Sequence, residues 1–150
     1  MNQKLSIMTT TKPSKKYWII STIAVLWNLI GIFAFMGQAF VSSAMLAELP
    51  ADQAELIRNT PQWLTGIFAI ATVTGLLGSI LLILRRKSAT TLFFISAVGV
   101  LIQMGYSFFA TDALQVYGIV EGLVMPLIVI LSAVYLYFFS VKSSKKGHLD

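Results

Sequence analysis

Three polar side chains inside long apolar stretches are the residues of this sequence whose types could do chemistry. Glu121 is an acid in one apolar run, and Asn28 and Gln103 are amides in two others. An acid in hydrocarbon costs a few kcal/mol, so it marks a candidate functional site. Amide side chains can bind the hydroxyl groups of a solute, or they can join two helices by hydrogen bonds. The three residues therefore indicate proton exchange, solute binding or helix packing.

These three residues are predicted to lie at one depth and to share helix faces with small residues. Counting along each helix places Asn28, Gln103 and Glu121 near, or slightly outside, the membrane midplane. Helical periodicity puts Gly31 on the face of Asn28 and Gly99 on the face of Gln103. Two interpretations stay open. Either a protonated Glu121 donates to one of the amides as a packing bond, or the group binds a solute or exchanges a proton.

Four further residues belong to the same hypothesis. Trp27 lies in mid-span and is predicted to be a core aromatic, with a stacking platform for a sugar ring as the alternative. Tyr106 shares a helix face with the mid-span glutamine. Pro126 lacks a backbone donor and frees the carbonyl near Gly122. These two residues predict a static kink or a hinge in the last span.

The elements that position these residues are four apolar segments. The chain has 150 residues, of which 57% are hydrophobic and 11% charged, with a mean hydropathy of +0.80. A soluble domain carries about 25% charged residues. Crossing a bilayer takes about 20 apolar residues. Four segments reach that length: about 17–41, 61–84, 91–110 and 115–139. The composition predicts an all-α polytopic membrane protein.

Charges are divided between the two sides of the predicted membrane. Lysine and arginine clusters precede the first span, separate the second from the third, and follow the fourth. Cytoplasmic loops carry the excess of lysine and arginine, so both termini are predicted in the cytoplasm. The opposite side collects one basic residue and several acids: Arg58, Glu48, Asp52, Glu55 and Asp112. We expect a multi-pass protein of a bacterial inner (plasma) membrane.

Short connections between the spans predict the topology. They make consecutive spans antiparallel neighbours, so we expect an antiparallel up-down four-transmembrane-helix bundle. Pro50 can open a helix, and a short outer amphipathic helix is expected after it. The predicted domains are a disordered basic cytoplasmic tail (1–16), a four-span membrane domain (17–140) and a basic cytoplasmic tail (141–150).

The beginning of the chain has two alternatives. Met8 is an alternative first residue to Met1, and Ser42-Ser43-Ala44 offers a cleavage site that would make the first apolar run a signal peptide. That run exceeds the usual ~7–15 residues of a signal core. An uncleaved first span is therefore favoured.

Residues typical of catalysis and metal binding are scarce. The chain has no cysteine, which excludes thiol exchange and thiolate metal sites. Its one histidine, His148, lies in the polar tail and cannot hold an intramembrane haem. The spans contain no pair of a nucleophile and a general base, so we predict a non-enzymatic protein with no cofactor and no metal site. The expected partners are the lipid bilayer and a homodimer or larger membrane complex, without nucleic acid.

Four short motifs carry a family resemblance. They are Leu26–Gly31 in the first span, Pro61–Trp63 at the start of the second, Gly75–Gly78 towards its end, and Leu92–Ser96 in the third. Together they resemble small bacterial four-helix integral membrane proteins of unknown function, some of which are labelled "sugar transporter". The resemblance covers about 17–139 and implies a four-span fold and a sugar-like solute. Small multidrug resistance transporters also have four spans, but their essential acid lies in the first helix, where this chain has none.

Two functions remain open at this point. The first is a small non-enzymatic membrane protein whose polar layer holds the bundle, or a partner subunit, together. The alternative is a small-solute (sugar-like) or proton-coupled transporter that uses Glu121. A water-filled vestibule reaching Asn28 and Gln103 would favour transport, whereas a Glu121 side chain facing lipid would argue against both.

Overall fold

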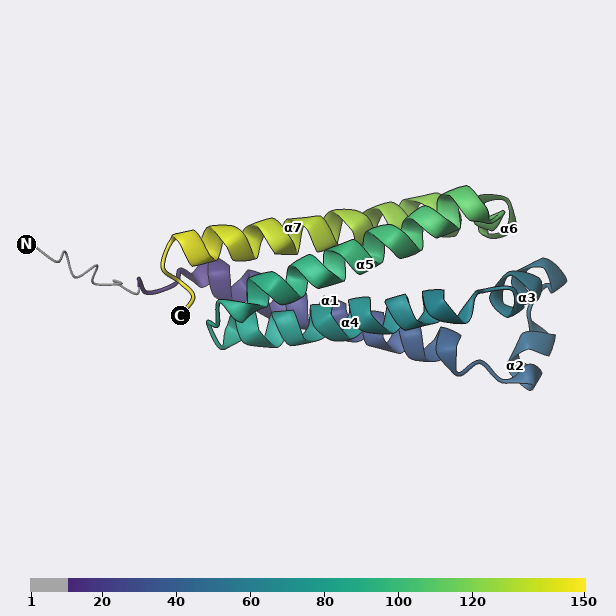
Figure 1. The fold of residues 1–150 in the computed structure, drawn as a ribbon, viewed down its shortest axis with the longest axis horizontal. Helices are drawn as coiled ribbons and strands as arrows, with labels where there is room; N and C mark the ends of the chain where they lie inside the picture. Colours follow the sequence, from purple (N-terminus) through teal and green to yellow (C-terminus); the bar gives the residue numbers. More distant parts are fainter. Residues whose placement is uncertain (1–10) are drawn as a thin grey trace, which may run out of the picture.

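The apolar runs form four long helical stretches in the computed structural model, which describes residues 11–150 (Figure 1). Three are single helices: α1 (Lys15–Ala39), α4 (Gln62–Ile83) and α5 (Ser88–Ala110). The fourth runs from Ala113 to Lys145 and includes the long helix α7 (Met125–Lys145). All four are long and apolar enough to cross a membrane. The described chain has the predicted all-α architecture, in which each helix satisfies its own backbone in lipid.

Both ends of the described chain lie at one end of the bundle, and the short helices lie at the other (Figure 1). Following the predicted topology, we call these the inner end and the outer end. The outer end carries α2 (Ser43–Glu48), α3 (Ala51–Arg58) and α6 (Ala113–Ile119). One short helix was predicted in the first outer loop, and the structure has two. They are separate because Leu49, which precedes a proline, is extended.

The two predicted tails are partly helical. Residues 1–10 lie outside the described residues, but α1 begins at Lys15, after Ser14 accepts a hydrogen bond from the Tyr17 amide at 3.4 Å. At the other end α7 continues to Lys145. Gly147, with φ of 70°, then turns the chain back.

The last residues pack on the bundle instead of extending from it. Leu149 is 2% exposed and belongs to a core cluster with Tyr17, Leu82 and Phe93. The Arg85 Nε donates to the His148 carbonyl at 2.8 Å, and the Asp150 amide donates to the Arg85 carbonyl at 2.6 Å. The C-terminal residues therefore close the inner end against the α4–α5 turn.

Consecutive spans pack on one another: α1 on α4, α4 on α5, and α5 on α7. Small residues allow the close approach, since a Cβ added to Gly99 would lie 2.9 Å from the Ala71 Cβ. No comparable backbone approach joins α1 to α7. Near the inner end their side chains meet, because Tyr17 stacks on Phe139 with ring centroids 5.8 Å apart. We call the boundary between α1 and α7 the seam.

The start of the fourth stretch is irregular. Gly118, near the C-terminal end of α6, has a non-helical φ of 75° and ψ of −175°, and a π turn, η1 (Val120–Val124), follows α6 directly. The Met125 amide donates to the Val120 carbonyl in this turn, just before Pro126. Chain direction therefore changes at Gly118, upstream of the kink or hinge predicted at Gly122 and Pro126.

Candidate functional site: an outer vestibule

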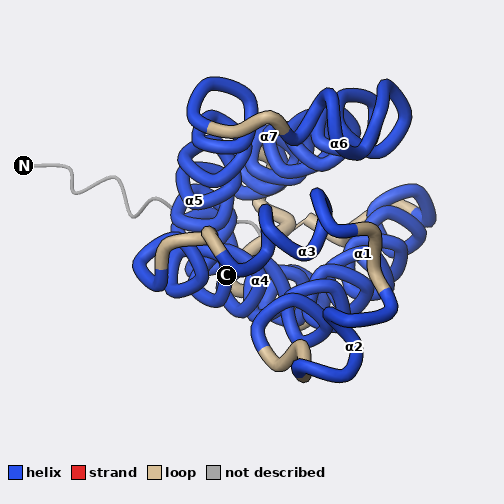
Figure 2. Tube along the Cα trace, turned by 90° about the vertical axis from the view of Figure 1, so that its right-hand side faces the viewer, coloured by secondary structure: helices blue, strands red, loops and turns tan. Residues whose placement is uncertain are grey.

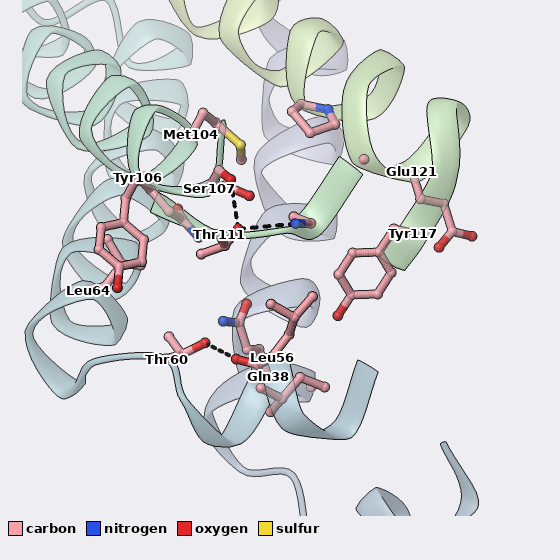
Figure 3. A pocket seen from close by; sticks show the side chains of 16 residues that line it. Gln38, Leu56, Thr60, Leu64, Met104, Tyr106, Ser107, Thr111, Tyr117 and Glu121 are labelled. Carbon is pink, nitrogen blue, oxygen red and sulfur yellow. Dashed lines mark hydrogen bonds between the residues drawn. The ribbon is translucent and has the colours of Figure 1, made fainter. Parts of the chain in front are cut away.

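A cavity of about 430 Å³ opens at the outer end beneath α3 (Figure 3). We call it the outer vestibule. Figure 2, which looks onto the outer end, shows α3 between the side formed by α1 and α4 and the side formed by α6 and α7. The lining residues are Gly37, Gln38, Leu56, Ile57, Thr60, Leu64, Gln103, Met104, Tyr106, Ser107, Thr111, Ala113, Tyr117, Glu121, Gly122 and Pro126.

The polar wall of the outer vestibule comes mainly from one face of α5 and from α6. Gln103 and Ser107 are four residues apart on one face of α5, and Thr111, four residues further on, follows directly after the end of this helix. Tyr117 of α6 extends over Gln38 and Leu56 from the opposite side (Figure 3). α3 contacts α6 and lines the vestibule with Leu56 and Ile57. The predicted outer helix is thus part of the vestibule wall.

Two hydroxyls of the vestibule already have partners. Thr111 Oγ1 donates to the Ser107 carbonyl at 2.7 Å, and Thr60 Oγ1 donates to the Leu56 carbonyl at 3.0 Å, as drawn in Figure 3. Within residues 11–150, five other uncharged polar side chains of the lining form no hydrogen bond with the protein. They are Gln38, Gln103, Tyr106, Ser107 and Tyr117. All five side chains are half-buried, so their polar groups are open to water or to a solute in the vestibule.

Glu121 lies at the rim of the outer vestibule. Its side chain is exposed and stands beside Tyr117, directed away from Tyr106 and Ser107 (Figure 3). A Cβ on the adjacent Gly122 would lie 2.8 Å from the Leu114 Cα. In a straight helix these two positions would be about 12 Å apart along the axis. The chain therefore folds back at Gly118, and the depth counted along a straight helix overestimates how far Glu121 lies from the outer end.

The packing bond predicted for Glu121 is not formed. Among the described residues, no hydrogen bond joins it to Asn28 or Gln103. Asn28 instead bonds to the neighbouring span: its Nδ2 donates to Ser79 Oγ at 2.9 Å and to the Ala24 carbonyl at 2.8 Å. Its Oδ1 packs on Gly75, where an added Cβ would lie only 2.2 Å away. Asn28 is therefore bound into the α1–α4 interface.

A second cavity, the central cavity, lies among the four spans and measures about 280 Å³. Its lining includes Trp27, Asn28, Phe68, Ser96, Gln103, Met104, Met125 and Ser132. Gln103 and Met104 line both this cavity and the outer vestibule. Gln103 thus connects the two spaces, and Trp27 is half-buried at the wall of the central cavity.

The remaining predicted residues line the outer vestibule. The Tyr106 ring meets the Trp63 ring edge-on, with centroids 5.6 Å apart. Gly122 and Pro126 contribute backbone and ring atoms on the α7 side. The structure thus brings Gln103, Tyr106 and Glu121 to one cavity and leaves Asn28 and Trp27 outside it.

Comparison with protein families, with curated proteins and with solved structures finds no match. The site is therefore interpreted from its own geometry. Within residues 11–150, no three His, Asp or Glu side chains are grouped so that they could hold a metal ion.

Sequence reasoning missed Gln38, Ser107, Thr111 and Tyr117. The four-residue spacing of Gln103, Ser107 and Thr111 was a usable indication of a polar face on the third span. Tyr117 had no such indication, because it reaches the vestibule only through the change of direction at Gly118.

Proposed function

We propose that this chain is a small, non-enzymatic membrane protein that binds a small polar solute from the outer side, in the outer vestibule. One observation supports this most strongly: five polar side chains without protein partners surround one cavity. A volume of about 430 Å³ lies in the range of small-molecule sites, roughly 300–1,000 Å³. Helix packing alone does not require such groups to stay unpaired.

The chemistry of the vestibule favours a solute that carries hydroxyl groups. Amides such as Gln38 and Gln103 offer both donors and acceptors, and the tyrosine and serine hydroxyls do the same. Tyr106 and Tyr117 add ring surface that suits the apolar face of a sugar. Glu121 at the rim adds attraction for a positive charge. The resemblance to proteins labelled as sugar transporters implies the same solute class.

We assign Asn28 a separate, structural role. Its bond to Ser79 and its contact with Gly75 are both made within the α1–α4 interface. The packing function considered for the polar layer thus applies to Asn28, and the solute function applies to the vestibule. Four apolar stretches support a membrane location, and the lysine and arginine distribution supports cytoplasmic termini in a bacterial inner membrane.

Transport is a second candidate, supported by the shared lining of two cavities. Gln103 and Met104 line both the outer vestibule and the central cavity, so a solute in the first lies next to the second. In a proton-coupled carrier Glu121 would exchange the proton, and this role requires its exposed carboxyl at the rim to be in contact with water and not with lipid.

Cysteine labelling tests the binding proposal, because the chain has no cysteine of its own. Ser107→Cys places a thiol in the vestibule, and Val98→Cys places a matched thiol on an exposed apolar position of the same helix. We expect a membrane-impermeant thiosulfonate reagent, added from the outer side, to label Ser107→Cys at least about tenfold faster, because reaction needs the hydrated thiolate. Equal labelling rates would contradict a water-filled vestibule.

Protection from labelling then tests the solute class. Glucose and choline serve as probes, one rich in hydroxyls and one cationic. Protection of Ser107→Cys by glucose is the expected result, whereas protection by choline alone would shift the assignment to a cation site around Glu121. Failure of both probes would refute the proposed solute classes.

Uptake into proteoliposomes tests the transport candidate. Radiolabelled glucose is followed with and without an imposed pH gradient, for the native chain and for Glu121→Gln. Accumulation that depends on the gradient, and is lost in Glu121→Gln, would establish proton coupling through this residue. Saturable protection of Ser107→Cys without uptake would leave binding as the function and exclude transport of that probe.

A further inference from the structure

A basic pocket lies at the inner end of the seam, far from the outer vestibule. It measures about 380 Å³ and is formed by the first turns of α1, the last turns of α7 and the folded-back C-terminal residues. We call it the inner pocket. Its polar lining is Ser14, Lys16, Lys142, Ser143, Lys146 and His148, and its apolar lining includes four aromatic rings.

The inner pocket carries positive charge without a compensating acid in its lining. Lys16, Lys142 and Lys146 all line it and are exposed, so their ammonium groups can reach a ligand. Burial lowers the pKa of His148, and the charges of Lys146 and Arg85 lower it further. Ser143 is 3% exposed, and its hydroxyl forms no hydrogen bond with the described residues. The lysine charges and the free hydroxyl donor suit an anion that carries acceptor oxygens.

The inner pocket continues into an apolar groove along the seam. This seam groove measures about 320 Å³ and runs between α1 and α7 from Ile20 and Tyr135 to Trp27 and Ile128. Ile20 and Tyr135 line both spaces. Ser132 also lines the groove, but its hydroxyl donates to the Val129 carbonyl at 2.9 Å, which leaves the groove surface apolar.

We propose that the inner pocket and the seam groove together bind one anionic phospholipid from the leaflet that faces the chain termini. The phosphate lies among Lys16, Lys142 and Lys146, and an acyl chain follows the groove past Trp27. A phospholipid joins a charged head group to an apolar chain. The basic inner pocket, which opens directly into the apolar seam groove, suits both parts of such a molecule. A soluble anion would use the pocket but leave the groove empty. This inference does not rest on the proposed function of the vestibule.

Fluorescence of Trp27 provides the test, since this residue lines the seam groove. A variant with Trp18→Phe and Trp63→Phe keeps Trp27 as its one tryptophan. It is reconstituted in phosphatidylcholine with a minor fraction of phospholipid brominated on its acyl chains, either phosphatidylglycerol or phosphatidylcholine. We expect stronger quenching by the anionic brominated lipid, and no such preference in a matched variant that keeps Trp63 at the outer end instead.

Lysine variants separate a site from general surface attraction. A lysine that donates a hydrogen bond directly to the lipid phosphate contributes about 1 kcal/mol, or about fivefold in affinity. Lys142→Gln and Lys146→Gln are each expected to lower the preference for anionic lipid about fivefold. Lys145→Gln, which removes the same charge from the same helix outside the pocket, is expected to leave it unchanged.

Three results would overturn the assignment. Equal quenching of Trp27 by the two brominated lipids would remove the anionic preference. An equal loss in Lys145→Gln would reduce that preference to diffuse charge attraction. Abolition of the preference by inorganic phosphate would assign the pocket to soluble anions. All the lysines changed are exposed, and circular dichroism of each variant confirms that the fold persists.

Discussion

The helices on the α1–α4–α5 side of the bundle pack closely, whereas the α1–α7 seam leaves a groove. On the first side glycines and serines meet across the interfaces, and the hydroxyls and amide there are bonded: Ser96 Oγ donates to the Ala71 carbonyl at 2.7 Å, and Asn28 binds Ser79. Along the seam, bulkier side chains such as Trp27 and Tyr135 face a groove. Two helices in lipid therefore pack without a groove where their backbones approach closely, and apolar character alone does not produce such packing.

The same contrast holds for polar groups. On the α1–α4–α5 side, Asn28, Ser79 and Ser96 all have protein partners and act in packing. Most of those in the outer vestibule have no protein partner, and they lie where the helices diverge toward α3 and α6 (Figure 1). Where the bundle is closed, polar residues stabilise it; where it is open, they are available to a ligand. Four predictions test this division, in order of decreasing effect.

Gly75→Val should be the most damaging change, because it fills the sealed side. A Cβ at this position would lie 2.2 Å from Asn28 Oδ1 and 2.9 Å from Ser96 Oγ. Overpacking of this kind costs about 3 kcal/mol. The free energy of unfolding in detergent micelles is the measurement. Gly66→Val, in the same helix but with nothing within 4 Å, is the matched control. Equal losses in both variants would show that α4 is not sealed at Gly75.

Gly118→Ala tests a glycine on the open side, where the reason for glycine is different. No atom lies within 4 Å of an added Cβ, but φ of 75° with ψ of −175° is a backbone conformation that residues with a side chain rarely adopt. We expect a loss of about 2 kcal/mol from backbone strain. Labelling of Ser107→Cys in this background should also change, because Tyr117 and Glu121 depend on the turn. An unaltered stability would mean that α6 and η1 can be joined differently.

Asn28→Ala should cost about 1 kcal/mol of unfolding free energy, which is typical of a polar contact between helices in membranes. The double-mutant cycle with Ser79→Ala measures the coupling of the pair, which should be positive because the bond joins these two side chains. The corresponding cycle of Asn28→Ala with Glu121→Gln should show no coupling. Coupling in the second cycle would restore the packing bond first predicted for Glu121.

Glu121→Gln should leave stability unchanged and alter only the electrostatics of the vestibule. A unit charge at roughly 10 Å in water is worth about 0.4 kcal/mol, or about twofold in a reaction rate. The ratio of cationic to anionic thiosulfonate rates at Ser107→Cys should therefore fall about fourfold. Glu48→Gln on α2, outside the vestibule lining, is the control. An unchanged ratio would remove Glu121 from the rim.

Much of the fold could be predicted because it depends on local properties. Span number, antiparallel order and the contrast between basic and acidic ends follow from segment length, short connections and charge placement. The role of small residues also followed from spacing. Asn28 was correctly placed on a packing face with Gly31, although its partner, Ser79, was not identified.

The candidate site could be predicted only in part. Gln103 and Tyr106 share the vestibule face of α5, as their spacing indicated. Glu121 was assigned to a common layer with Asn28 because the fourth stretch was treated as straight. The turn at Gly118 invalidates the depth counted along a straight helix. The φ of a single glycine in an apolar run cannot be predicted from the sequence.

The sequence by itself determined that this chain has four segments long and apolar enough to cross a membrane, and which end of the bundle is basic. Hydrocarbon thickness and charge act on segments regardless of their neighbours. Only the tertiary structure decided that Glu121 lies at a rim, that Leu149 is buried and that the seam stays open. These features depend on how closely backbones approach across the bundle and on one positive φ. Neither is a property of a segment alone, since each is set by the elements packed around it.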